Sequence, residues 1–145
     1  MAVTDQATRL LQAIPHITHD VSMMCQALEL SSVRVGWVTW YVMARNVANF
    51  LTVQRKGDIN ALDYLSESEA GAWRRQAAPE IGLVIGSASE LATHLSWKRV
   101  DEAASVQEPS KAVTDALILL WSDFLARVPE PYRAEFVRSL AGQQK

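Results

Sequence analysis

The feature that most restricts the fold of this chain is its most hydrophobic segment, residues 33–52. Its large and small apolar residues recur with a period close to 3.6: they are Val33, Trp37, Trp40, Tyr41, Ala44, Val47, Ala48 and Leu51. This period favours a helix, although the β-branched and aromatic residues of 33–42 would also suit a strand. Val38 and Val42 lie on another side, so the helix is apolar almost all round. Such a helix is expected at the centre of a fold, buried by its neighbours.

The segment before this stretch also shows helical spacing. Thr4 and Asp5 suit the start of a first helix over 5–14, and Pro15 is expected to end or kink that helix. A further apolar stripe follows, whose members are spaced by four, three and four: Ile17, Val21, Met24 and Leu28. This spacing predicts a second helix that ends near residue 30.

The segment after the central stretch divides into a turn and further helices. Lys56-Gly57-Asp58 is a stop-and-turn signal, and a short helix is expected over 59–65. Ser66 and Glu69 have the spacing of a capping box for the next helix. Longer apolar stripes predict helices over 79–95 and 109–128, separated by a polar loop over 101–108, and a last helix is expected over 132–140.

These elements predict an all-α fold, a helical bundle of four long helices plus two or three short ones. The chain of 145 residues is long enough for one domain, which we expect over 1–145. Its 14 basic and 16 acidic residues give no global attraction to nucleic acid or to an anionic membrane. No stretch of 18 apolar residues is present, and the single cysteine favours a reducing, cytoplasmic location.

Arg45, Asn46 and Asn49 are the polar residues that stand out in the central helix. Because burying an unpaired guanidinium costs several kcal/mol, Arg45 is expected to have an acidic partner. The candidate partners are Asp63, Glu67, Glu69 and Glu90. One interpretation is a structural ion pair that fixes the helix register. The other is an arginine that faces a cleft and binds an anion or takes part in catalysis.

A second group of candidate residues lies between 90 and 99. His94 follows Glu90 by four residues, which fits either a solvated helix face or a histidine that Glu90 orients in a cleft. Trp97 and Arg99 belong to a short aromatic and basic run. The candidate cleft is therefore Arg45, Asn46, Asn49, Asp63, Glu90, His94, Trp97 and Arg99. No nucleophile elbow accompanies it, so no catalytic residue is assigned.

His16, His19 and Asp20 are spaced as i, i+3 and i+4, a spacing that suits a metal site. Two helical ligands and a third from elsewhere could bind a divalent cation. Three histidines are, however, an ordinary number for a chain of this length. His16 and His19 therefore stay weak candidates, and neither a metal nor another cofactor is predicted.

Three stretches taken together resemble a known group of proteins. They are ARNVANFL (44–51), DINALDYL (58–65) and ELATHLSWKRV (90–100). The resemblance is to small bacterial all-helical proteins of uncharacterised activity, and it covers roughly residues 31–100. It implies a helical fold and implies no activity.

The same region is distantly similar to the HEPN superfamily (higher eukaryotes and prokaryotes nucleotide-binding), helical bundles that include RNases of toxin and antiphage systems. Their motif is an arginine, a polar residue and, a few positions later, a histidine. Arg45 and Asn46 match its start, whereas the positions of the histidine hold Phe50, Leu51 and Thr52. The resemblance implies either a member in which His94 replaces the missing histidine in space, or a catalytically inactive member. It also implies a homodimer.

Three functions follow, in order of preference. The first is a noncatalytic interaction or regulatory protein, with a protein partner or as a homodimer, because no complete active site is found. The alternative is a HEPN-like RNase or nucleotide-binding domain that uses Arg45, Asn46 and His94. The third is a metal-dependent bundle enzyme that uses His16, His19 and His94.

Overall fold

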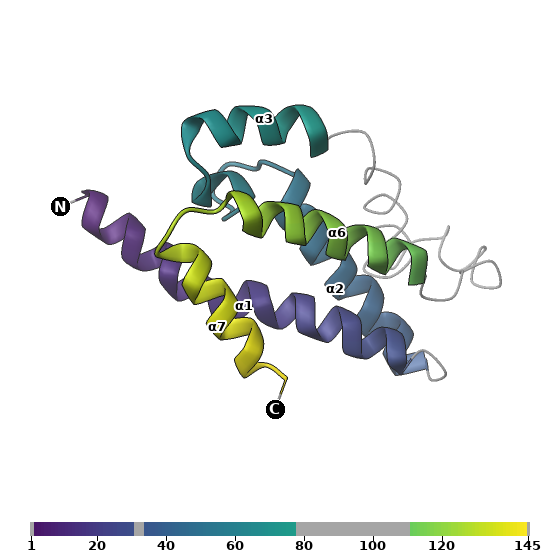
Figure 1. Ribbon diagram of the computed structural model, residues 1–145. Helices are drawn as coiled ribbons and strands as arrows, with labels where there is room; N and C mark the ends of the chain where they lie inside the picture. The colour runs from purple at the N-terminus through teal and green to yellow at the C-terminus, as the bar shows by residue number, and fades with distance from the viewer. Residues whose placement is uncertain (1, 31–33, 78–110, 145) are drawn as a thin grey trace.

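The computed structural model describes residues 2–30, 34–77 and 111–144 (Figure 1). Within these ranges every regular element is a helix, so the predicted all-α class is confirmed. The elements are α1 (Ala2–Glu29), α2 (Arg34–Thr52), the 3₁₀ helix η1 (Ala61–Tyr64), α3 (Glu67–Ala77), α6 (Lys111–Arg127) and α7 (Tyr132–Gly142). None of the helices in the described ranges has the length and apolar character needed to cross a membrane.

The helices form one packed arrangement around α1 and α2. α1 packs along α2 and is crossed by α7, while α6 packs on α2, as Figure 1 shows. The helix expected over 79–95 and the loop expected over 101–108 lie outside the described residues. The predicted set of four long helices therefore stays a prediction, as does the extent of the domain.

The predicted central helix is confirmed as α2, with one correction. Trp40, Ala44, Val47, Ala48 and Leu51 are each at most 2% exposed. Val38, by contrast, is 48% exposed, so the expectation that this helix is buried all round is wrong. The reason is geometrical, since at 100° per residue Val38 projects about 135° from the middle of the face that these five residues form.

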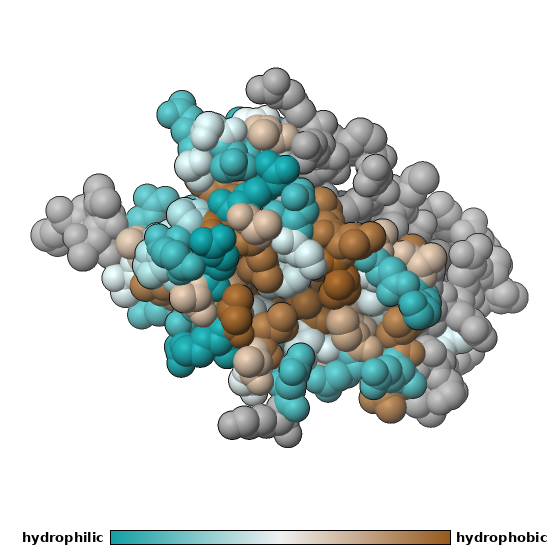
Figure 2. Space-filling view, viewed as in Figure 1, coloured by the Kyte–Doolittle hydropathy of each residue, from teal (hydrophilic) through white to brown (hydrophobic). Residues whose placement is uncertain are grey.

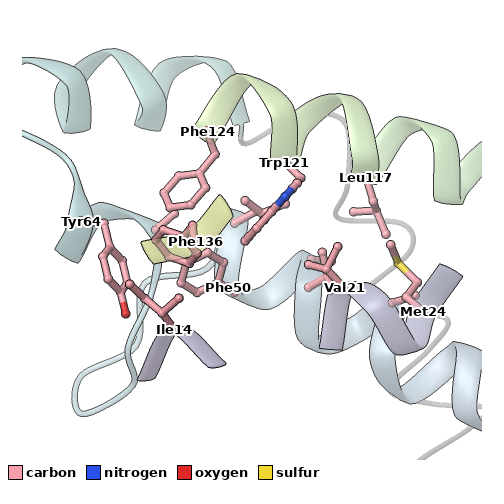
Figure 3. Close-up of a cluster of buried hydrophobic side chains, with 14 of the residues drawn as sticks. Ile14, Val21, Met24, Phe50, Tyr64, Leu117, Trp121, Phe124 and Phe136 are labelled. Carbon is pink, nitrogen blue, oxygen red and sulfur yellow. The ribbon is translucent and has the colours of Figure 1, made fainter. Parts of the chain in front are cut away.

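An aromatic cluster joins the ends of several helices (Figure 3). Phe50 of α2 meets Phe124 of α6 edge-to-face, with ring centroids 5.4 Å apart, and Tyr64 of η1 meets Phe136 of α7 at 5.0 Å. Trp121 of α6 completes the cluster at 5.5 Å from both Phe124 and Phe136. Edge-to-face pairs contribute beyond the area that they bury. The cluster therefore fixes the C-terminal end of α2 against η1, α6 and α7.

Pro15 does not end the first helix, which was one of the two outcomes that the sequence predicted. α1 runs without a break from Ala2 to Glu29 with Pro15 inside it, and Thr4, expected as a cap, is a helical residue. An interior proline removes one hydrogen bond and costs about 3 kcal/mol. Here the buried stripe continues on both sides of the proline through Ile14 and Val21. Burial of that stripe outweighs the local cost.

The chain between α2 and α3 folds as the turn and short-helix signals predict. Gly57 has φ 93, a conformation that glycine adopts without strain. Asn60 caps η1: its side chain accepts from Leu62 N at 3.0 Å, and Asp63 Oδ2 accepts from Asn60 N at 2.8 Å. Ser66 precedes α3, where its hydroxyl accepts from the backbone N–H of Glu69 at 3.4 Å. The segment 53–60 is thereby held next to the end of α2.

Candidate functional site

Three residues singled out in the sequence, Arg45, Asn46 and Asn49, line one open cleft of about 520 Å³. Its walls are α1, α2 and the segment 53–59 that follows α2. The other lining residues are Ile17, Asp20, Phe50, Val53, Arg55, Gly57, Asp58 and Ile59. We call this cavity the α1–α2 cleft.

The helical repeat explains why α2 presents these residues to a cleft. Arg45 and Asn49 are four residues apart, so they lie on one side of the helix. That side faces away from the buried stripe that contains Ala44 and Ala48. Arg45 is therefore a half-buried side chain at a cavity wall, and the expectation that it is carried into the interior is wrong.

Two of the acids expected beside Arg45, Glu69 and Asp63, make contacts elsewhere. Glu69 Oε2 lies 2.8 Å from Arg127 Nη1 in an ion pair between α3 and α6. Asp63 accepts from the backbone of Asn60 and borders a different cavity, so the structure does not bring it to the α1–α2 cleft. Glu90, His94, Trp97 and Arg99 lie outside the described residues, and their place in the cleft stays a prediction.

Asp20 is a cleft residue that the sequence pointed to only as a companion of histidines. The Asn46 side chain of α2 lies close enough to the Asp20 carboxylate of α1 to favour its charged form. Burial raises the pKa of Asp20 above its usual value, and this effect exceeds the opposing effects of the Asn46 side chain and of the nearby His19 and His16. The cleft thus contains a carboxylate whose charged form is disfavoured by burial.

His16 and His19 do not line the cleft. Both are exposed on α1, and their influence on Asp20 is electrostatic. Within the described part of the chain, no three His, Cys, Asp or Glu side chains are grouped as metal ligands would be. The described residues therefore give these two histidines no third ligand.

Asn49 carries an unsatisfied hydrogen-bond acceptor. Its carboxamide oxygen is out of contact with solvent and has no hydrogen-bond partner among the residues that the structure describes. An unpaired buried acceptor costs about 1–3 kcal/mol. Asn49 also lines the cleft, so a bound molecule that displaces the atoms over this oxygen and donates to it would recover that cost.

Arg55 and Asp58 are cleft residues that sequence reasoning missed. Both are exposed on the segment after α2, where the Asp58 N–H donates to the Arg55 carbonyl at 3.2 Å. The stop-and-turn signal at Gly57 located this turn, but it did not show that the turn folds back beside α2. With Arg45 and Asp20, these residues give the cleft two cations and two acids.

The cleft has the chemistry of a binding site. Its described lining offers guanidinium and carboxamide donors, carboxylate and carboxamide acceptors, and the apolar surfaces of Ile17, Phe50 and Ile59. It holds no Ser, Thr, Cys or His among the described residues, so no activated nucleophile of the usual kind is present there. The arrangement can therefore hold a molecule that carries positive and negative groups and both hydrogen-bond donors and acceptors.

No protein-family model matches the chain, and neither a curated protein nor a solved structure is significantly similar to it.

Proposed function

We propose that this chain is a noncatalytic interaction protein that binds an extended segment of a partner protein in the α1–α2 cleft. The observation that carries the proposal is the Asn49 carboxamide, whose oxygen has no partner in the described structure and which lines the cleft beside Asn46. An extended polypeptide presents backbone N–H donors and C=O acceptors in alternation. A carboxamide has both a donor and an acceptor, so it can pair with such a backbone.

The remaining lining suits the same occupant. Ile17, Phe50 and Ile59 offer apolar contact to a side chain of the bound segment. Arg45, Arg55, Asp20 and Asp58 line the same cavity, so its charges are balanced. A phosphodiester backbone is recognised mainly by cations, and two carboxylates in the same cleft would repel it. Balanced charge therefore favours a polypeptide over a polyanion.

The alternative proposal is a HEPN-like RNase or nucleotide-binding domain. The observation in its favour is that Arg45 and Asn46, which match the start of that motif, open onto one cleft. In this alternative His94 would supply the missing histidine. The homodimer also stays a proposal and rests on the resemblance alone. A reducing, cytoplasmic location is proposed because Cys25 is the single cysteine.

Selection from a phage-displayed library of linear peptides, with the intact chain as bait, tests the proposal. We expect enriched peptides with a shared consensus, and we expect Asn49→Ala and Arg45→Ala each to weaken their binding by about tenfold, or about 1.4 kcal/mol. Gln12→Ala is the matched control, because Gln12 is an exposed residue of α1 that does not line the cleft. Peptides that bind Asn49→Ala as tightly as the unmodified chain would refute the proposal.

The same preparation tests the alternative with a labelled single-stranded RNA. We expect the RNA to stay intact and to bind no better to the unmodified chain than to Arg45→Ala. Cleavage that Arg45→Ala abolishes would show that the chain is an RNase and would overturn the noncatalytic assignment.

A further inference from the structure

A second cavity lies between α1, α6 and α7, away from the α1–α2 cleft, and has a volume of about 820 Å³. Its apolar lining consists of Val21, Ile118, Trp121, Leu125 and Leu140. Polar residues at its edge are Ser22, Gln26, Glu29, Ser122, Gln143 and Gln144. Figure 2 shows hydrophobic residues gathered on this face, between the positions of α6 and α7 in Figure 1. We call this cavity the α1–α6–α7 groove.

Trp121 gives the groove an unsatisfied donor. The residue is 3% exposed and lines the groove, and its indole N–H has no acceptor among the described residues. The other fully buried indoles of the described chain are satisfied: Trp40 Nε1 donates to Thr114 Oγ1 at 2.9 Å, and Trp73 Nε1 donates to the Leu51 carbonyl at 2.7 Å. An unpaired buried donor costs about 1–3 kcal/mol, so an acceptor that displaces the atoms over the Trp121 N–H and pairs with it would be stabilising.

The charges at the groove decide which molecules fit it. Glu29 is the one charged residue among the described lining residues, and no Lys, Arg or His lines the groove. Burial raises the pKa of the Cys25 thiol, and the nearby carboxylates of Glu29 and Asp115 raise it further. The thiol therefore stays protonated, and the local field opposes an anion.

We propose that the α1–α6–α7 groove is a binding site for a neutral, mostly apolar small molecule that carries a carbonyl oxygen as the acceptor for Trp121. The volume of about 820 Å³ lies within the range of small-molecule sites, about 300–1,000 Å³. The apolar lining contacts the body of the molecule, the indole N–H fixes its oxygen, and Glu29 disfavours a carboxylate in its place. This site is independent of the proposed partner-binding cleft.

The probe for this site is prodan, a neutral aromatic ketone whose fluorescence reports the polarity and hydrogen bonding around its carbonyl group. We expect it to bind the intact chain with one-to-one stoichiometry and blue-shifted emission. Trp121→Phe keeps an aromatic ring and removes the donor, and it should weaken binding by about tenfold. Equal binding by Trp121→Phe and by the unmodified chain would overturn the proposed hydrogen bond.

A second pair of variants changes only exposed positions and so leaves the hydrophobic core intact. Ser122→Trp places a bulky side chain at the exposed edge of the groove and should abolish prodan binding. Ala126→Trp makes the same change four residues later on α6, at an exposed position that does not line the groove, and should leave binding unchanged. Full binding by Ser122→Trp would show that prodan binds elsewhere and would overturn the site.

Competition then tests the charge of the ligand. Octanamide should displace prodan, whereas octanoate, a carboxylate of the same chain length, should compete at least tenfold less well. Glu29→Gln should reduce the difference between octanamide and octanoate in displacing prodan. Equal displacement by the amide and the carboxylate would refute the assignment of a neutral ligand.

Discussion

Replacing Gly36 by alanine tests the close approach of α1 and α2. Gly36 is buried near the start of α2, and a Cβ atom there would collide with the carbonyl oxygen of Leu30 and would lie 2.7 Å from its carbonyl carbon. These are backbone atoms, so the collision is relieved only by moving the end of α1 away from α2. A backbone shift of this kind costs about 1–3 kcal/mol. The higher helix propensity of alanine offsets about 0.8–1.0 kcal/mol of this cost.

We therefore expect Gly36→Ala to lower the free energy of unfolding by up to about 2 kcal/mol. Gly71→Ala is the matched control, because Gly71 lies in α3 with no neighbouring atom within 4 Å of a Cβ built there. That variant should raise the free energy of unfolding by about 0.5–1 kcal/mol. Urea unfolding followed by circular dichroism measures both changes through the midpoint at unchanged slope. A higher midpoint for Gly36→Ala would refute the packing of Leu30 on α2.

Three further substitutions test the core and the cleft. Tyr64→Phe removes the hydroxyl that donates to the Leu10 carbonyl at 2.8 Å, and it should cost about 1–3 kcal/mol in urea unfolding; an unchanged midpoint would contradict the contact. A double-mutant cycle of Trp40→Phe and Thr114→Val should show about 0.5–1.5 kcal/mol of coupling through their 2.9 Å hydrogen bond, and additivity would contradict it. Asp20→Asn should stabilise the fold at pH 7 and have a smaller effect at pH 3. Because the pKa of Asp20 is raised in the folded chain, its contribution to stability is fully present below the pKa of the unfolded chain, near 3.8. That contribution is lost as the pH rises through the pKa of the folded chain. Thermal unfolding at the two pH values measures this, and equal effects would contradict the assigned burial.

The fold was predictable where a long periodic pattern decided it. The spacing of Trp40, Ala44, Val47 and Leu51 predicted the buried face of α2, and that face is buried. Pro15 shows the limit of local rules. The rule that a proline ends or kinks a helix takes no account of the burial of Ile14 and Val21 on its two sides, and the helix continues through Pro15.

The cleft was predictable only in part for a related reason. Arg45, Asn46 and Asn49 share a helix, so their common placement follows from the helical repeat. Asp20 and Arg55 reach the same cavity from other segments, and their approach depends on how α1 and the turn after α2 pack. No periodicity within one segment contains that information. Nor does sequence spacing show that an acceptor on Asn49 or a donor on Trp121 lacks a partner.

The most direct test of the proposed function is a nuclear magnetic resonance titration of the ¹⁵N-labelled chain with a peptide from the selection. The side-chain NH₂ signals of Asn46 and Asn49 report directly on the wall of the α1–α2 cleft. The account predicts that both pairs of signals shift as the peptide is added and that they saturate at one stoichiometric equivalent. Unmoved signals from both carboxamides, with shifts confined to the α1–α6–α7 groove or to another surface, would contradict it.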